Sequence, residues 1–312
     1  GVSDGVAGFV SSCPVIDPIG PAVTIRNVVG EILGTVPAPE QVLDQSLLRP
    51  ARNTISTPLL AGGLPKRGIS GHYSAILDGF SLDYFISTGT KNRMIVFSPG
   101  FLDTRRYPYP YFQRMKWAED FEETCIFLAD PTLLLGNTQI GWFIGDKNTH
   151  YLPTVAKYLG SLAKSHSIPP HNITFFGSSA GGFSSIGLAA HLRGARALAV
   201  NPQTNALRLH SPSQLAATLR SCLEINDLDE AYRKYAGRFV LSEMFRQLGN
   251  VPRITIWQNF YDRYHLEHHL IPFINDVKDM NPTETIEIHM AARPDDGHDP
   301  PDLPVIRHLF GR

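Results

Sequence analysis

From about residue 70 onward, short runs of apolar residues alternate with longer segments in which apolar residues recur every three or four positions. A short unbroken apolar run is typical of a strand buried on both faces of a parallel sheet, and the second spacing predicts a helix. The alternation predicts an α/β fold with a mainly parallel central sheet covered by helices. The predicted strands are Arg93–Ser98, Thr124–Ala129, Asn172–Phe176, Ala195–Val200, Arg253–Gln258 and Thr285–Met290. The predicted helices are Tyr111–Glu122, His150–His166, Gly182–Leu192, Ser242–Leu248, His265–Met280 and Leu303–Phe310.

An N-terminal antiparallel hairpin precedes this alternation. The segments His72–Leu77 and Leu82–Ser87 flank the turn pair Asp78-Gly79, which favours a tight hairpin. We therefore assign residues 71–312 to one α/β domain. Residues 1–70 are rich in proline and glycine and predict an irregular N-terminal arm, with one possible short helix at Glu40–Leu48.

One segment between two predicted strands is too long for an ordinary crossover. Residues 203–249 are mostly helical in pattern, and we interpret them as a helical cap insertion over the C-terminal edge of the sheet. Active sites of open α/β sheets lie at that edge.

Charge and cysteine content narrow the function classes. The chain has 28 Lys and Arg against 29 Asp and Glu, a net charge of −1, and no charge block typical of a nucleic-acid groove. No stretch reaches the roughly 18–20 apolar residues that cross a bilayer. Cys13, Cys125 and Cys222 lie far apart, which disfavours a disulfide framework and a cysteine metal site. We expect a cytoplasmic protein, although a chain that begins at Gly1 can have been trimmed.

The sharpest chemical signal is a G-x-S-x-G motif centred on Ser179. It lies in Phe175-Phe176-Gly177-Ser178-Ser179-Ala180-Gly181-Gly182, between a predicted strand and a predicted helix. Small residues on either side let strand and helix approach closely, and the turn exposes the serine at the helix N-terminus. The bare motif also occurs in ordinary tight turns. In this context, we predict that Ser179 is a nucleophile and that the neighbouring Ser178 is not.

A serine nucleophile needs an imidazole to accept its proton and a carboxylate to orient that imidazole. Asp262 follows the predicted strand Arg253–Gln258 and could also serve as a helix N-cap. His298 lies in the loop after the last predicted strand, whereas His289 lies inside that strand and is expected to pack. We predict that Asp262 is the acid and His298 the general base. The chain order Ser, Asp, His differs from the orders of the two other common serine-protease folds.

The acyl oxyanion needs backbone N–H donors. Ala180, at the start of the predicted helix, supplies one. The loop Ile95–Phe101 supplies the second, which we assign to Phe101, with Gly100 beside it.

Other candidate residues have competing interpretations. His265 and His269 share a helix face, but the pattern is not H-E-x-x-H and gives no clear third ligand, so we predict no metal. We expect His265 at the rim of the site as a substrate contact. Tyr109 and Trp142 could line a substrate cleft, or they could simply pack around a proline-rich loop.

The segment from Met94 to Phe310 resembles the α/β-hydrolase superfamily. It is similar, more narrowly, to hydrolase-like proteins of bacterial capsule, surface-glycan and accessory-secretion systems, including some that O-acetylate glycans. The resemblance implies ester hydrolysis or acyl transfer on a small acyl ester or an acylated glycan, without a cofactor. A lipase or peptidase, or a catalytically silent binding protein, remains the alternative. The segments that carry the resemblance are Ala129–Thr132, Ile140–Trp142, Phe176–Phe183, Asn201–Gln203 and Gly297–Pro301.

Overall fold

The computed structural model describes residues 15–19, 22–26, 32–37, 64–280 and 286–311, and the chain divides into two compact units, 1–56 and 57–312. The first unit contains the antiparallel strands β1 (Val15–Ile19), β2 (Ala22–Arg26) and β3 (Ile32–Pro37), where the sequence predicted an irregular arm. The helix predicted at Glu40–Leu48 lies outside the described residues.

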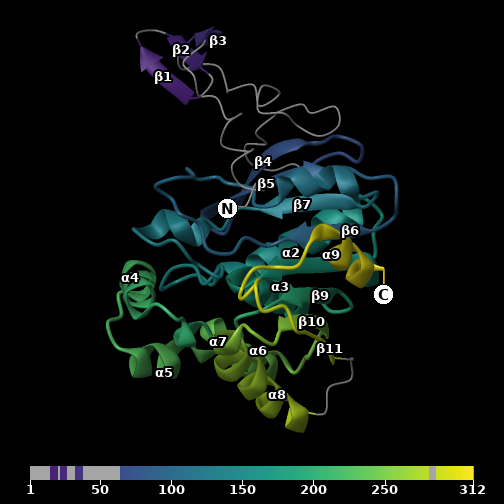
Figure 1. The fold of residues 1–312 in the computed structure, drawn as a ribbon. Coiled ribbons are helices and arrows are strands. Elements are labelled where there is room, and N and C mark those ends of the chain that lie inside the picture. Colours follow the sequence, from purple (N-terminus) through teal and green to yellow (C-terminus); the bar gives the residue numbers. More distant parts are fainter. Residues whose placement is uncertain (1–14, 20–21, 27–31, 38–63, 281–285, 312) are drawn as a thin grey trace. The chain divides into compact units, whose positions relative to one another are not determined.

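The second unit is built on an eight-stranded sheet with the order β11-β10-β9-β8-β6-β7-β5-β4 (Figure 1). The β4–β5 and β5–β7 pairs are antiparallel, and every other pair in this sheet is parallel. The structure thus confirms a mainly parallel sheet with an N-terminal antiparallel hairpin. The strands are β4 (Gly71–Leu77), β5 (Phe80–Ser87), β6 (Met94–Phe97), β7 (Thr124–Leu128), β8 (Ile173–Ser178), β9 (Arg196–Val200), β10 (Arg253–Asn259) and β11 (Ile286–Ala291).

Helices connect the parallel strands at the predicted places. The predicted helix Tyr111–Glu122 is the exception, because Arg114 has a φ of 64° and only the 3₁₀ segment η2 follows it. The α-helices are α2 (Tyr151–Ser165), α3 (Ala180–His191), α4 (Pro212–Leu223), α5 (Leu228–Phe239), α6 (Leu241–Leu248), α7 (Arg263–His265), α8 (Ile271–Val277) and α9 (Leu303–Phe310). The other helical segments are η2 (Met115–Asp120), η3 (Pro131–Leu135), η4 (Pro170–Asn172), η5 (Ala206–Arg208), the π-helix η6 (Leu266–Leu270) and η7 (Lys278–Met280).

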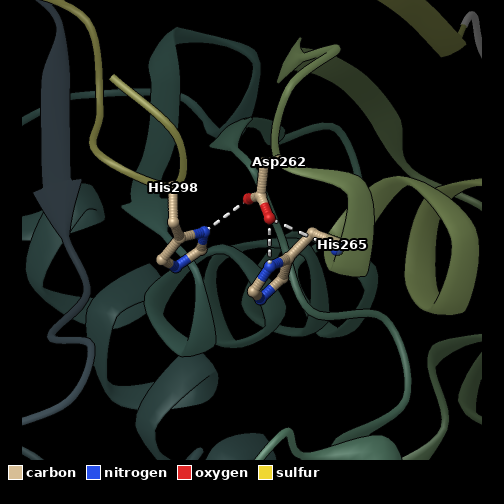
Figure 2. Close-up of side chains that lie close together, drawn as sticks. All are labelled: Asp262, His265 and His298. Carbon is tan, nitrogen blue, oxygen red and sulfur yellow. Dashed lines mark hydrogen bonds and ion pairs between the residues drawn. The ribbon is translucent and has the colours of Figure 1, made fainter. Parts of the chain in front are cut away.

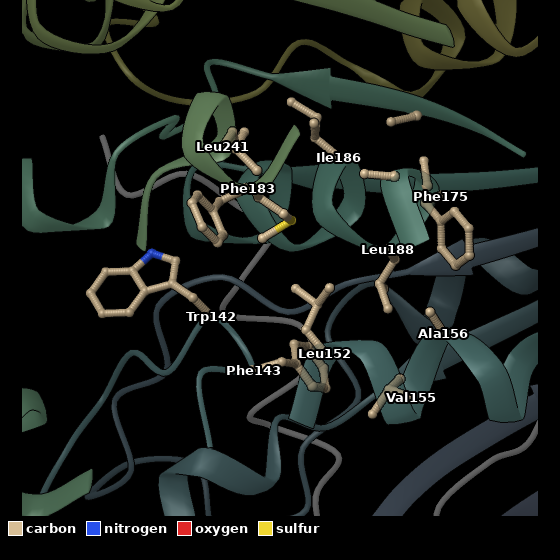
Figure 3. Packing of buried hydrophobic residues seen from close by; sticks show 14 of the residues in the cluster. Trp142, Phe143, Leu152, Val155, Ala156, Phe175, Phe183, Ile186, Leu188 and Leu241 are labelled. Carbon is tan, nitrogen blue, oxygen red and sulfur yellow. The ribbon is translucent and has the colours of Figure 1, made fainter. Parts of the chain in front are cut away.

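The hydrophobic core fixes α3, whose N-terminus carries Ser179. Phe183 and Ile186 of α3 are fully buried, as are Leu152 and Val155 of α2 (Figure 3). Gly187 lets the two helices approach, since an added Cβ would lie 2.9 Å from Leu152 Cδ1. Burial of each side chain of this size contributes roughly 1.5–3 kcal/mol, so α3 is firmly packed beneath Ser179, the residue that precedes it.

The long segment between β9 and β10 is helical, as its pattern predicted, and contains α4, α5 and α6. A hydrogen bond of 2.6 Å between Thr218 Oγ1 and Thr138 Oγ1 joins α4 to the loop that follows η3. Within the described residues, none of the helices combines the length and the apolar character that crossing a bilayer requires.

Candidate active site

Ser179 occupies a strained turn between β8 and α3. Its φ of 56° and ψ of −122° are unusual for a residue with a side chain and cost roughly 1–3 kcal/mol. Backbone hydrogen bonds hold the turn: Ser179 N donates to Val200 O at 3.0 Å, and Ser179 O accepts from Gly182 N at 3.0 Å, from Gln203 N at 3.1 Å and from Phe183 N at 3.3 Å. The surrounding chain therefore fixes the conformation that presents this serine.

The two glycines of the motif are required by close backbone contacts. A Cβ on Gly177 would lie 2.2 Å from Gly181 O, and a Cβ on Gly181 would lie 2.6 Å from Ser98 O. Real Cβ atoms do not approach backbone oxygens so closely. The G-x-S-x-G motif thus lies in the strand–turn–helix context that is typical of a nucleophile elbow.

The two adjacent serines have different surroundings. Ser178 is 9% exposed, and its Oγ accepts a hydrogen bond of 2.5 Å from Arg114 Nη2. The Arg114 guanidinium lies over the rings of Trp117 and Phe176, and burial lowers its pKa to about 10. Ser179 is only half-buried, so it is the more accessible hydroxyl of the pair.

The loop after β6 lies against this turn. Gln113 holds it with two hydrogen bonds, accepting from Gly100 N at 2.9 Å and donating to Phe101 O at 2.7 Å. Because the N–H of Gly100 is engaged, its predicted role beside Phe101 as an oxyanion donor is not available in this conformation. No hydrogen bond among the described residues uses the N–H of Phe101. As the first residue of α3, Ala180 likewise has no intrahelical acceptor for its N–H.

Asp262 lies just after β10 and binds two histidines. It is 6% exposed, and Oδ2 accepts from His298 Nδ1 at 2.5 Å while Oδ1 accepts from His265 Nδ1 at 3.0 Å (Figure 2). Oδ1 also caps the following helix by accepting from His265 N at 3.4 Å. Burial alone would raise the pKa of this carboxyl, but the hydrogen bonds from His265 and His298 outweigh burial and hold the pKa well below its usual range.

Two asparagines that the sequence did not mark as functional anchor the loop of His298. The amide of Asn259 donates to Arg293 O and Gly297 O, both at 2.8 Å, and its Oδ1 accepts from Arg293 N at 3.0 Å. Asn201 donates to His298 O at 3.1 Å and accepts from Asn259 N at 2.8 Å. Both side chains are fully buried. The available signals were their position at the ends of adjacent strands and, for Asn201, its place in a segment that carries the resemblance.

The side chain of His298 is partly exposed and bonds to Asp262 through one ring nitrogen. Its side chain is 43% exposed, and since Nδ1 faces Asp262, Nε2 is the atom left to exchange a proton. No hydrogen bond joins His298 to Ser179 Oγ within the described residues. Such bonds often form or tighten only when substrate binds.

Of the three candidate substrate contacts, His265 differs from its expected place at the rim, and the buried positions of Trp142 and the Tyr109 hydroxyl favour the packing alternative. His265 is 7% exposed and bonded to Asp262 instead of lying at the rim. Trp142 is 1% exposed within the core cluster, where its Nε1 donates to Gln203 Oε1 at 2.7 Å (Figure 3). The hydroxyl of Tyr109 is buried, and burial together with the nearby Asp83 carboxylate raises its pKa. Neither Trp142 nor the polar end of Tyr109 therefore faces an open cleft.

The group around Asp262 also has the composition of a metal site. Donor atoms of Asp262, His265 and His298 lie within 4.8 Å of one another. The two imidazoles already bond to different oxygens of the carboxylate, which is the pattern of an acid–base group. The expectation that no metal is needed stays a prediction.

No protein-family model matches this chain, and no curated protein matches it. Several solved structures do match the chain, at low sequence identity. The capsule O-acetyltransferase of Neisseria meningitidis serogroup A superposes with a TM-score of 0.58 at 17% identity, covering 82% of this chain and 96% of that enzyme. A histidine-to-alanine mutant of the same enzyme in complex with CoA gives a TM-score of 0.55 at 16% identity, covering 75% and 94%. The chain therefore has the α/β-hydrolase fold, as the resemblance implied.

Proposed function

We propose that this chain is a serine-dependent acyl-ester hydrolase or acyltransferase with Ser179 as nucleophile, His298 as general base and Asp262 as the orienting acid. The observation that carries the proposal is the Asp262–His298 hydrogen bond, which joins two loops 36 residues apart in the sequence. These loops follow β10 and β11, two strands on the same side of β8 in the parallel sheet. Ser179 stands at the same carboxyl edge, on a strained turn at the end of β8.

The first half-reaction transfers an acyl group to Ser179. His298 Nε2 takes the proton of Ser179 Oγ as Oγ attacks the ester carbonyl, and Asp262 stabilises the imidazolium that results. The N–H groups of Ala180 and Phe101 donate to the oxyanion. When the C–O bond of an ester donor breaks, His298 returns the proton to the departing alkoxide, which leaves as an alcohol. With a thioester donor such as acetyl-CoA, the C–S bond breaks instead and the protonated leaving group is a thiol.

The second half-reaction decides between hydrolysis and transfer. A water or a sugar hydroxyl gives its proton to His298 and attacks the acyl-enzyme carbonyl. As the bond from the carbonyl carbon to Ser179 Oγ breaks, His298 returns the proton to Oγ, and a carboxylic acid or a new ester is released. The similar solved enzyme is a capsule O-acetyltransferase, and one of its structures holds CoA. An acetyl group is therefore the first acyl group to test, with a glycan hydroxyl as acceptor and acetyl-CoA as donor.

Labelling with a fluorophosphonate tests the nucleophile without a choice of substrate. We expect the unmodified protein to be labelled and Ser179→Ala to remain unlabelled. Ser178→Ala is the matched control, since it removes the adjacent hydroxyl, and it should still be labelled. Equal labelling of all three proteins would refute the assignment of Ser179. No labelling of the unmodified protein would favour a catalytically silent binding protein.

A chain-length series of p-nitrophenyl esters, measured beside an acetylated oligosaccharide, tests the acyl group. We expect acetyl esters to exceed octanoyl esters by about tenfold or more in kcat/KM, because a site shaped for a small group discriminates by roughly 1–3 kcal/mol per methylene. A rate that rises with chain length would instead indicate a lipase.

A further inference from the structure

We propose that His265 is a positioning residue that holds the Asp262 carboxylate so that one of its oxygens stays directed at His298. The proposal rests on the function proposed for Ser179, Asp262 and His298, and it concerns a residue that the expected mechanism does not require.

The geometry around the Asp262 carboxylate favours a positioning role for His265. Each oxygen of Asp262 receives a different imidazole, with His298 Nδ1 at 2.5 Å from Oδ2 and His265 Nδ1 at 3.0 Å from Oδ1 (Figure 2). A carboxylate held at one oxygen can still turn about its bond to Cβ. A carboxylate held at both oxygens cannot turn without breaking a hydrogen bond, so the His265 bond fixes the direction in which Oδ2 points.

The two rings also pack against each other. The imidazoles of His265 and His298 are stacked with centroids 4.0 Å apart and an interplanar angle of 15°. His265 is itself held from behind, because His269 stacks on it at 5.0 Å and 26°. His269 in turn accepts from Thr204 N at 3.3 Å. His265, which donates to Asp262, is therefore stacked between His269 and His298, and its ring packs against the ring of His298.

The protonation state of His265 suits a hydrogen-bond donor rather than a second charged group. Burial lowers the pKa of His265, and the nearby His298 and His210 lower it further, while Asp262 acts in the opposite direction. An ionised carboxylate only accepts, so the proton of the neutral ring lies on Nδ1. The Nε2 atom is buried and has no hydrogen-bond partner in the described part of the chain. A role in simple packing would be filled better by an apolar side chain, which would leave no such atom unsatisfied.

Two amide substitutions separate positioning from packing. In His265→Asn the amide nitrogen takes the place of Nδ1 and can still donate to Asp262, whereas in His265→Gln it takes the place of Nε2 and cannot. We expect His265→Asn to keep kcat within about threefold and His265→Gln to lose about tenfold or more, with KM changed less than twofold in both. If His265→Gln fails to fold, His265→Phe keeps the stacked ring without the donor and should show the same loss of kcat.

A spectroscopic signature makes the test independent of catalysis. The proton of the short His298–Asp262 bond should give a far-downfield ¹H resonance, present in the unmodified protein and His265→Asn but shifted or broadened in His265→Gln. That result would support the positioning role even if no fluorophosphonate labelled Ser179, in which case the proposed function alone would fail. Equal kcat and equal resonances in the two variants would refute the proposal. Loss of turnover in both, to the level of Ser179→Ala, would also refute it and identify His265 itself as the base.

Discussion

Replacing Asn259 with alanine should loosen the loop that carries His298 without changing the chemistry of the imidazole itself. The side chain of Asn259 makes four hydrogen bonds: to Arg293 O and Gly297 O at 2.8 Å, from Arg293 N at 3.0 Å and from Tyr261 N at 3.3 Å. A typical protein hydrogen bond contributes about 1 kcal/mol net. Since the partners lie on a partly exposed loop and regain water, we expect a loss of about 2–4 kcal/mol in the free energy of unfolding.

The effect on turnover should exceed the effect on stability. A displacement of about 1 Å in a reacting group can cost on the order of 100-fold in rate. We therefore expect Asn259→Ala to lower kcat/KM for a short acyl ester by about 100-fold, with the melting temperature lowered on the order of 10 °C. Thermal unfolding and ester hydrolysis, both measured below the melting temperature of the variant, give the two numbers.

Asn250→Ala is the matched control for this prediction. Its side chain makes one hydrogen bond, 2.7 Å from Nδ2 to Ala190 O, near the end of α3 opposite to Ser179. We expect a loss of about 1 kcal/mol and no change in kcat/KM. Asn259→Ala and Asn250→Ala could instead lose the same small amount of stability and keep full activity. That result would refute the proposal that Asn259 anchors the His298 loop for catalysis.

Further substitutions test the acid, the base and the turn. His298→Ala should reduce ester turnover about as far as Ser179→Ala, and the double variant should lose no more, because such residues act as a unit. Additive losses in the double variant would refute the proposal that Ser179 and His298 act together. The lowered pKa of Asp262 stabilises the fold above the unfolded value of about 3.9, and this contribution is lost as the pH falls through the folded pKa. The difference in melting temperature between the unmodified protein and Asp262→Asn should therefore shrink below about pH 4, and a constant difference would contradict the assignment. Gly181→Ala should unfold the turn, since its Cβ would lie 2.6 Å from Ser98 O. At Gly249, where nothing lies within 4 Å, alanine should cost only about 1–2 kcal/mol for its left-handed backbone; equal melting temperatures for the two alanine variants would refute the close-contact argument.

Local patterns were enough to predict most of the second unit. Unbroken apolar runs gave the parallel strands within a few residues, and the helix Leu303–Phe310 was predicted residue for residue. Ser179, Asp262 and His298 could be selected because each follows a strand, at the edge where loops of a parallel sheet meet. Chain order and the periodicity of apolar residues are sufficient to select these three residues.

Contacts between distant segments could not be predicted in this way. The sequence left open whether Trp142 lines a cleft or packs, because its bond to Gln203 spans 61 positions and accompanies a backbone φ of 50° at Trp142. The same reason applies to Asn259, whose partners lie 34 and 38 residues away on the His298 loop. His265 was expected at the rim of the site because it lies close to Asp262 in the sequence, but its stacking on His298 joins segments far apart in the chain and could not be predicted in this way.

The burial of Trp142 provides the protein with an internal optical reporter. Its indole donates to Gln203, and the backbone N–H of Gln203 in turn binds Ser179 O, so only one residue separates this fluorophore from the strained turn. Trp117 lies beside Arg114, which binds Ser178, the residue before Ser179. Two of the three tryptophans in the chain are thus connected to the same turn through one intervening residue each. Acylation or distortion of Ser179 should therefore change the intrinsic emission, and the half-reactions could be followed without a chromogenic substrate.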